Sequence, residues 1–123
     1  MAYATIILVL VAVVCQSQWS MPANAAVLVG STATFTCQTH SSEVCWTYRQ
    51  NVSEAGAPDD VCREGSRNKF TDRCNVSRRR TDGTYTLTIN NVQLSDAGFY
   101  SCEDCFDLLI ATTHLLVLGK IFL

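Results

Sequence analysis

The sequence has no apolar run long enough to cross a membrane as a helix. Its longest run, Ala4–Val14, extends over about 11 residues, whereas a membrane-spanning helix needs ~20. A run of this length near the N-terminus is typical of a signal peptide. Cys15 and Ser17 fit the small positions before a signal-peptidase site, although no Lys or Arg precedes the run. We therefore expect a signal peptide at residues 1–17 and one domain at residues 18–123, secreted or exported as the ectodomain fragment of a cell-surface receptor.

The sequence also lacks the motifs of the common enzyme classes. It has no Ser-His-Asp arrangement, glycine-rich phosphate loop or nucleotide motif, and His40 and His114 are far apart without acidic partners at metal-ligating spacing. The Cys102–Cys105 segment has C-x-x-C spacing, but it lacks the helix N-terminus that lowers a thiol pKa. A net charge of −2, with no exposed aromatic platform, argues against nucleic-acid binding. We predict no enzyme, no cofactor, no metal site and no nucleic-acid partner.

Cysteine, in contrast, is abundant. The chain has seven cysteines, and removal of Cys15 with the signal peptide leaves an even number. These six are Cys37, Cys45, Cys62, Cys74, Cys102 and Cys105. An even number in an exported chain predicts three disulfides. Two glycosylation sequons, which start at Asn51 and Asn75, agree with export.

Short segments in which apolar and polar residues alternate occupy the rest of the chain. Such alternation, rich in Thr and aromatic residues, predicts half-buried strands. The expected strands are Val27–Val29, Ala33–Cys37, Val44–Arg49, Thr84–Ile89, Phe99–Glu103 and Thr112–Leu118. Asn51–Asp60 is expected to be a long solvated loop, and Asp82-Gly83 is a strong turn signal. The pattern predicts an all-β antiparallel sandwich or barrel without a convincing helix.

Three residues resemble the signature of the immunoglobulin superfamily. Cys37 is followed by Trp46 and then by Cys102, and Asp96–Cys102 matches the family pattern D-x-G-x-Y-x-C. In that family a strand-B cysteine bonds a strand-F cysteine across two sheets, and a strand-C Trp packs on the bond. The resemblance covers about Val27–Gly119. It implies an immunoglobulin-like antiparallel Greek-key β-sandwich with a Cys37–Cys102 disulfide.

Other residues resemble the variable type of this family, the V-set. The segment Asp72–Ser77 resembles its strand D, and Leu87 lies in the stretch that resembles strand E. The resemblance implies that Arg73 pairs with Asp96 at the base of the domain. It also implies that Tyr100 is the tyrosine-corner residue, whose hydroxyl bonds to backbone a few residues upstream.

The sequence departs from the V-set pattern in three places. Cys74 stands where strand D normally has Phe, so a crosslink replaces a core aromatic. The joining motif Phe-Gly-x-Gly is absent, which argues against a rearranged antigen-receptor chain. Only about ten residues separate Cys62 from Arg73, so we expect the C″ strand to be reduced.

The other four cysteines allow three pairings. Strand alternation points both Cys45 and Cys105 outward on neighbouring strands, on a diagonal near the upper end of disulfide reach. We therefore prefer Cys45–Cys105, with Cys62–Cys74 joining the edge of the sheet. A Cys45–Cys62 link stays open as the alternative, because it resembles a front-face link between strands C and C′ in other members of the family.

The leading functional hypothesis is an extracellular recognition module for immune recognition or cell adhesion. What the resemblance implies is binding of a protein partner, or of a second copy, through the sheet formed by strands G, F, C and C′. The candidate contact residues on this sheet are Thr47, Arg49, Arg63, Glu103, Asp107 and Leu108.

The alternative hypothesis is a secreted, disulfide-rich defence protein. Seven of the nine basic residues lie in the Arg63–Arg80 stretch, and such a local basic field attracts anionic glycans or other anionic surfaces. The simpler interpretation, which we favour, is that Arg73 pairs with Asp96 and that Arg78 and its neighbours are solvated.

Overall fold

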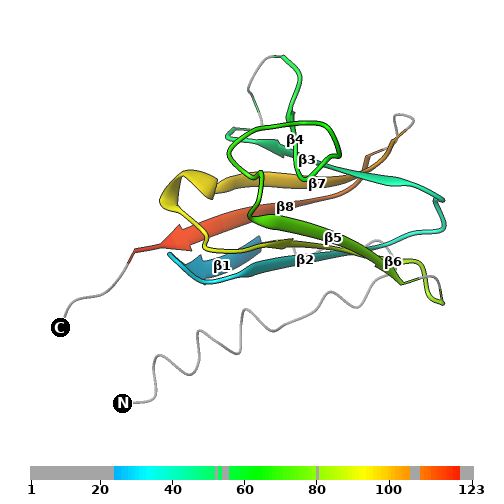
Figure 1. Cartoon of the computed structure of the whole chain (residues 1–123), viewed down its shortest axis with the longest axis horizontal. Helices are drawn as coiled ribbons and strands as arrows, with labels where there is room; N and C mark the ends of the chain where they lie inside the picture. The colour runs from blue at the N-terminus through cyan, green and yellow to red at the C-terminus, as the bar shows by residue number, and fades with distance from the viewer. Residues whose placement is uncertain (1–23, 52, 54–55, 80, 106–108, 120–123) are drawn as a thin grey trace.

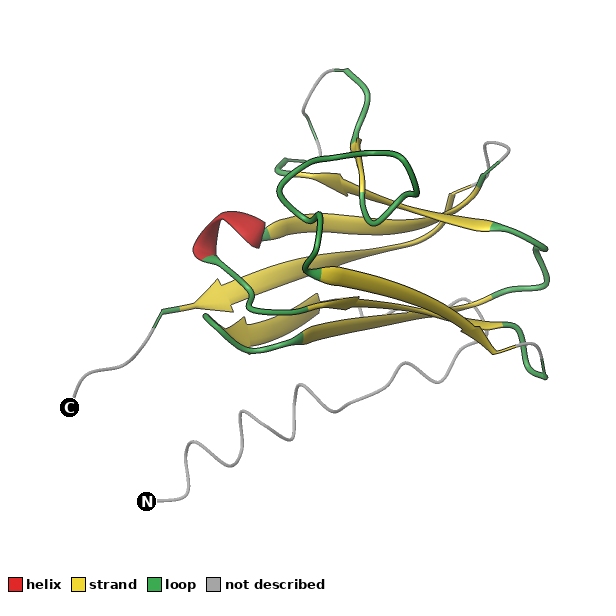
Figure 2. Cartoon of the chain, viewed as in Figure 1, coloured by secondary structure: helices red, strands yellow, loops and turns green. Residues whose placement is uncertain are grey.

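The structure of the chain is a computed structural model. It describes residues 24–51, 53, 56–79, 81–105 and 109–119. The expected signal peptide, residues 1–17, and two candidate contact residues, Asp107 and Leu108, lie outside these described residues. All regular structure in the described part is β-strand, apart from one short helical turn, η1 (Leu94–Asp96) (Figure 2). The strands are β1 (Asn24–Leu28), β2 (Ala33–Gln38), β3 (Val44–Arg49), β4 (Asp59–Asp60), β5 (Cys74–Arg79), β6 (Thr84–Ile89), β7 (Gly98–Asp104) and β8 (Leu109–Leu118).

The strands form two sheets that pack as layers (Figure 1). The front sheet has the order β1-β8-β7-β3-β4, and the back sheet has the order β2-β6-β5. All pairings are antiparallel except β1 with β8, which is parallel. The predicted all-β sandwich is therefore confirmed, and the parallel pair at the edge of the front sheet is a departure from the antiparallel expectation.

Strand limits agree best with the sequence where the alternation is strongest. The expected strands Val44–Arg49 and Thr84–Ile89 are β3 and β6 without change. The expected loop Asn51–Asp60 was wrong at its end, because Asp59 and Asp60 form β4 and pair with Tyr48 and Thr47 on the otherwise open edge of β3. Residues 61–73 contain no strand, so C″ is absent between β4 and β5.

The core lies between the sheets and follows the alternation of their strands. Inward side chains such as Phe35, Leu87 and Tyr100 are at most 1% exposed, and the rings of Phe35 and Tyr100 stack with centroids 4.8 Å apart. Cys37 of β2 is bonded to Cys102 of β7, with Cα atoms 6.4 Å apart. This bond joins residues 65 positions apart in sequence and contributes about 4 kcal/mol in the chain-entropy description.

Trp46 fills the space beside this disulfide. It is 3% exposed and lies opposite Cys102 in the register of β3 and β7. Its indole Nε1 has no hydrogen-bond partner within the described part of the chain. Its contribution is therefore the burial of a large apolar ring rather than a polar contact.

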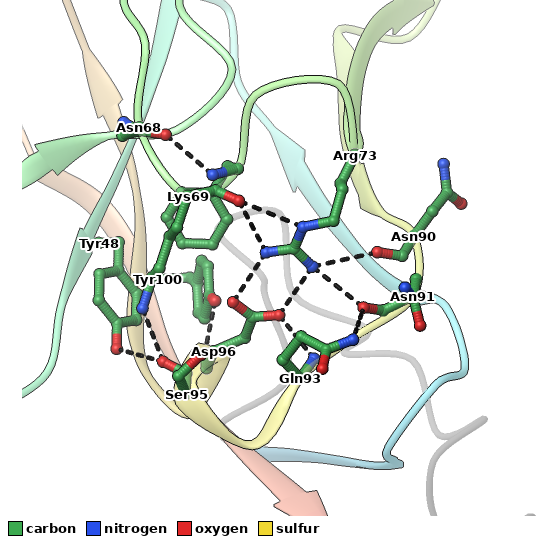
Figure 3. Close-up of polar contacts among 11 residues, drawn as sticks. Tyr48, Asn68, Lys69, Arg73, Asn90, Asn91, Gln93, Ser95, Asp96 and Tyr100 are labelled. Carbon is green, nitrogen blue, oxygen red and sulfur yellow. Dashed lines mark hydrogen bonds and ion pairs between the residues drawn. The ribbon is translucent and has the colours of Figure 1, made fainter.

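An ion pair closes the end of the sandwich at which η1 meets the turn before β5 (Figure 3). The Arg73 guanidinium donates two hydrogen bonds to the Asp96 carboxylate, at 2.9 and 3.0 Å, and others to three backbone carbonyls. Asp96 is fully buried, and its carboxylate also accepts the backbone N–H of Gln93 at 2.8 Å. The hydrogen bonds with Asp96 raise the pKa of Arg73. Because every oxygen has a donor, the buried charge is fully compensated.

Two tyrosines complete this end of the core. The Tyr100 hydroxyl donates to the Asp96 carbonyl at 2.6 Å, and the Tyr48 hydroxyl donates to the Ala97 carbonyl at 2.7 Å. Burial raises the pKa of Tyr100. Gly98 has a φ of 150°, and a Cβ there would approach the Arg49 carbonyl to 2.7 Å. The glycine of the D-x-G-x-Y-x-C pattern is thus required for the close approach of β3 and β7.

Candidate recognition face

The outer surface of the front sheet, here called the front face, is set by strand alternation. On β7, Tyr100 and Cys102 point into the core, so Phe99, Ser101 and Glu103 point outward. Residues directly opposite one another on neighbouring strands point to the same side of a sheet. The strand registers therefore identify the other members of this face.

The front face carries most of the exposed large hydrophobic residues. In the described part of the chain six such side chains are exposed, and four of them belong to this face. These four are Leu28 (50% exposed), Leu109 (56%), Leu116 (45%) and Leu118 (40%). Leu28 lies opposite Leu118 across the β1–β8 pair, and Ala26 lies opposite Leu116. We call Leu28, Leu116 and Leu118 the leucine strip.

Next to the leucine strip the front face carries both aromatic and polar side chains. His114 of β8 lies opposite Phe99 of β7, and their rings stack with centroids 4.4 Å apart. One position along, the hydroxyls of Ser101 and Thr112 share a hydrogen bond of 2.9 Å. These cross-strand pairs hold the centre of the face in a fixed arrangement.

Polar side chains cover the β3–β4 side of the face. The Thr47 hydroxyl donates to the Glu103 carboxylate at 3.2 Å. Thr47 points outward as expected but is only 7% exposed, because it lies on a central strand with Glu103 bonded to it. Glu103, rather than Thr47, is therefore available for contact on this side. Arg63 follows β4 and forms an exposed 3.5 Å ion pair with Asp60.

The remaining candidate contact residue, Arg49, lies opposite Phe99 at the end of β3. The structure thus brings Arg49 and Glu103 onto one face and places Arg63 beyond its edge. The sequence-based candidates omitted the leucine strip. Its signal was present in the alternation of Leu116 and Leu118 with the partly buried Val117.

Two disulfides lie at the β3–β4 side of the domain. Cys45 is bonded to Cys105, with Cα atoms 5.1 Å apart, and Cys62 is bonded to Cys74, with Cα atoms 5.7 Å apart. The alternative Cys45–Cys62 link is not the one present. Cys62–Cys74 connects the segment after β4 to the start of β5, so it joins the two sheets where no C″ strand does so.

The outer surface of the back sheet, here called the back face, has a different composition. Its outward positions are all polar: Thr34, Thr36, Gln38, Asn75, Ser77, Arg79, Thr84, Thr86 and Thr88. Asn75, the first residue of one sequon, is exposed on β5, and Asn51, the first residue of the other, is exposed in the loop after β3. The Asn75 side chain therefore projects from the back face.

Most of the described basic residues of the Arg63–Arg80 stretch contact other parts of the protein, and Arg80 lies outside the described residues. Arg73 is bound to Asp96, and the Lys69 Nζ donates to the Ser95 carbonyl at 2.6 Å above the Tyr48 ring. Burial lowers the pKa of Lys69. Other members have partners of their own: Arg63 with Asp60, Arg78 with the Ser42 carbonyl and Arg79 with Asp82.

Neither a metal centre nor a membrane segment is seen in the part of the chain that the structure describes. No three His, Cys, Asp or Glu side chains are grouped there to hold a metal ion. Within the same residues, no helix is long and apolar enough to cross a membrane.

The two-sheet sandwich, its inter-sheet disulfide and its tyrosine corner define a domain of the immunoglobulin type. Residues 20–118 match the family model described as Immunoglobulin V-set domain. The chain belongs to the immunoglobulin V-set family, and the variable-type prediction is confirmed.

Two known proteins illustrate this relationship. The mouse B-cell antigen receptor complex-associated protein beta chain is 31% identical over 112 residues, which cover 85% of this chain and 44% of that protein. The chain thus spans less than half the length of this relative. Among solved structures, the first immunoglobulin domain of the mouse polymeric immunoglobulin receptor has a TM-score of 0.70 at 20% identity, over 85% of this chain and 96% of that domain. This second likeness shows the fold alone.

Proposed function

We propose that the chain is an extracellular, non-enzymatic recognition module of the immune system that binds a protein partner through its front face. The observation that carries this proposal is the distribution of exposed apolar side chains. Leu28, Leu109, Leu116 and Leu118 are all on the front face, whereas the outward positions of the back face are polar. Protein interfaces place apolar anchors at their centre and polar groups at their rim.

The layout of the front face fits this anatomy. The leucine strip lies on β1 and β8, and Glu103 and Arg49 lie on the neighbouring strands β7 and β3. The exposed leucines lose water contact when a partner covers them, and the charged residues select the partner and its orientation. Isolated exposed leucines are common on protein surfaces, but several on one face mark an interaction surface.

The relative in mouse supports a role in receptor assembly. Its name places it in the B-cell antigen receptor complex, and we propose a comparable association for this chain with another membrane-receptor ectodomain. Glycosylation at Asn75 leaves the front face uncovered, because Asn75 belongs to the back face. A signal peptide at residues 1–17 and secretion, or presentation as part of a longer receptor, belong to the same proposal.

The defence-protein alternative receives less support. Binding to an anionic surface needs several free cations on one side of the molecule. Lys69 and Arg73 instead contact the protein itself, and Arg63 and Arg79 each face a carboxylate. The recognition module is therefore the function that the structure supports better.

The experiment is a binding screen with two matched variants. Wild-type protein, Leu116→Asp from the front face and Thr86→Asp from the back face are presented as tetramers to a panel of receptor ectodomains from the source species and to the chain itself. We expect at least one ectodomain, or the chain itself, to bind wild type and Thr86→Asp but not Leu116→Asp. Circular dichroism checks that both variants stay folded.

Two results would overturn the proposal. One is a partner that tolerates Leu116→Asp and is lost with Thr86→Asp, since this would place recognition on the back face. The other is binding only to heparin or anionic vesicles, with loss at moderate salt, since this would favour the defence-protein alternative.

A further inference from the structure

The edge of the sandwich between β4 and β5 is open. On β5, Val76 lies opposite Leu87 and so points to the interior side of the back sheet. Leu87 is fully buried, yet Val76 is 38% exposed. The difference arises because residues 61–73 form no strand to cover this edge. An interior-facing side chain is thus left beside an open groove.

This groove has a volume of about 480 Å³, within the range of pockets that bind organic groups. Its walls are mixed: the apolar part comes from Trp46 and Val61 on the front sheet side, from Val76 of β5 and from parts of both outer disulfides, and the rest is polar. The disulfides Cys45–Cys105 and Cys62–Cys74 hold these walls in place. The groove is therefore a preformed feature of the fold.

The rim of the groove carries an excess of negative charge. Glu43, Asp60, Arg63 and Glu64 all line it. Arg63 forms the ion pair with Asp60, which leaves Glu43 and Glu64. Both are exposed, and neither has a hydrogen bond or ion pair with another residue of the described chain. A cation that entered the groove would meet two free carboxylates.

We propose that this groove receives an arginine side chain displayed by a protein partner. The aliphatic stem of arginine packs along apolar surface while its charged end stays near water. Its guanidinium forms short, charge-assisted hydrogen bonds with carboxylates. In the groove the stem contacts Val76 and the disulfide, and the guanidinium lies between Glu43 and Glu64. This site is separate from the front face, and the leucine strip takes no part in it.

The test is a nuclear magnetic resonance titration of the disulfide-bonded protein with three probes. The blocked tripeptide Ala-Arg-Ala is compared with the same peptide carrying citrulline, which has the shape of arginine without its charge, and with butylguanidinium, which has no backbone. We expect saturable shifts of the Trp46 indole and Val76 methyl signals with the arginine peptide. The citrulline peptide should bind about tenfold more weakly.

Charge variants of the rim sharpen the test. Glu43→Gln combined with Glu64→Gln should weaken the arginine peptide about tenfold, and Arg63→Gln should strengthen it about two- to threefold by removing a like charge. Asp72→Asn is the matched control, because Asp72 is exposed, does not line the groove and has a φ of 69° that asparagine tolerates. Asp72→Asn and Leu116→Asp should leave the affinity unchanged.

Leu116→Asp should abolish binding through the front face but leave the affinity for the arginine peptide unchanged, so this variant separates the two proposals. Shifts at Trp46 and Val76 that are absent, equal for the citrulline peptide or unaffected by the Glu43 and Glu64 substitutions would overturn the arginine assignment. Binding of butylguanidinium without binding of the peptide would also overturn it, because the groove would then accept small cations rather than a partner side chain.

Discussion

The front and back faces of this domain are both built by strand alternation, but their outward side chains differ in character. On the back face, outward positions of β2 and β6 such as Thr34, Thr86 and Thr88 form a polar surface. On the front face, Leu28 and Leu118 occupy equivalent outward positions and remain exposed. Threonine has high β-propensity and ends in a hydroxyl, so it supports a strand without adding an apolar patch. The difference shows that leucine on the front face is not needed to make a sheet.

The largest effect on stability should come from a change in the buried Arg73–Asp96 ion pair, which belongs to neither face. Arg73→Leu leaves the buried Asp96 carboxylate without its main partner and should lower the free energy of unfolding by about 3 kcal/mol. Chemical denaturation measures this loss. Arg79→Leu, which breaks an exposed ion pair with Asp82, is the control and should have a much smaller effect. Equal losses for the two variants would contradict the role given to the buried pair.

A glycan placed on the front face should show that this face, and not the back face, binds the partner. Thr112→Asn with His114→Thr creates a sequon on β8, in the middle of the front face. A glycan there should reduce partner binding at least about 100-fold, because it occupies the contact area. The natural sequon at Asn75 on the back face is the control, and its removal by Asn75→Gln should leave binding unchanged. Mass spectrometry verifies occupancy, and unchanged binding with the front-face glycan would argue against the proposal.

An intermediate effect is expected at alkaline pH, from the core that both sheets share. Burial raises the pKa of Tyr100 above its ordinary value of 10.0, so the folded chain keeps a proton that the unfolded chain releases. The stability from this group is complete below about pH 10 and falls as the pH rises further, by about 1.4 kcal/mol per pH unit.

The comparison of wild type with Tyr100→Phe isolates this contribution. The variant loses the hydrogen bond to the Asp96 carbonyl, worth about 1 kcal/mol. It has no phenol to ionise at this position, so it also lacks the fall in stability above about pH 10. Urea denaturation at several pH values from about 9 to 11 should therefore show the two stabilities converging. A constant difference over this range would show that Tyr100 ionises equally in both states.

The smallest effects on stability should come from placing a polar residue on the front face and an apolar residue on the back face. Leu116→Thr on the front face and Thr86→Val on the back face should each change the free energy of unfolding by less than about 0.5 kcal/mol. Both residues sit on the solvent side of their sheets. Thermal unfolding checks this expectation. A loss of more than about 1 kcal/mol for Leu116→Thr would mean that the leucine strip serves the stability of the domain rather than recognition.

Local pattern predicted the sandwich well, because each strand carries its own alternation. The limits of β3 and β6 follow directly from Val44–Arg49 and Thr84–Ile89. The short strand β4 has no such signal: Asp59 and Asp60 are poor strand formers, and only the free edge of β3 makes them a strand.

The candidate site was harder to predict, for a physical reason. Side-chain alternation says that Thr47 points outward, but not that its position on a central strand beside Glu103 leaves it 7% exposed. It also does not reveal that Leu28 and Leu118, 90 positions apart in the sequence, are neighbours, because the parallel pairing of β1 with β8 is a long-range contact. The open groove next to Val76 depends in turn on a strand that is missing.

Hydroxyl-radical footprinting of the chain bound to the partner found in the ectodomain screen tests the central claim most directly. Leu28, Leu116 and Leu118 are exposed in the free chain, and so is Leu94, which is 60% exposed and belongs to η1 rather than to the front sheet. The account predicts that oxidation of the leucine strip falls on binding, while oxidation of Leu94 is unchanged. An unchanged leucine strip, with protection on β5 and β6 instead, would contradict it.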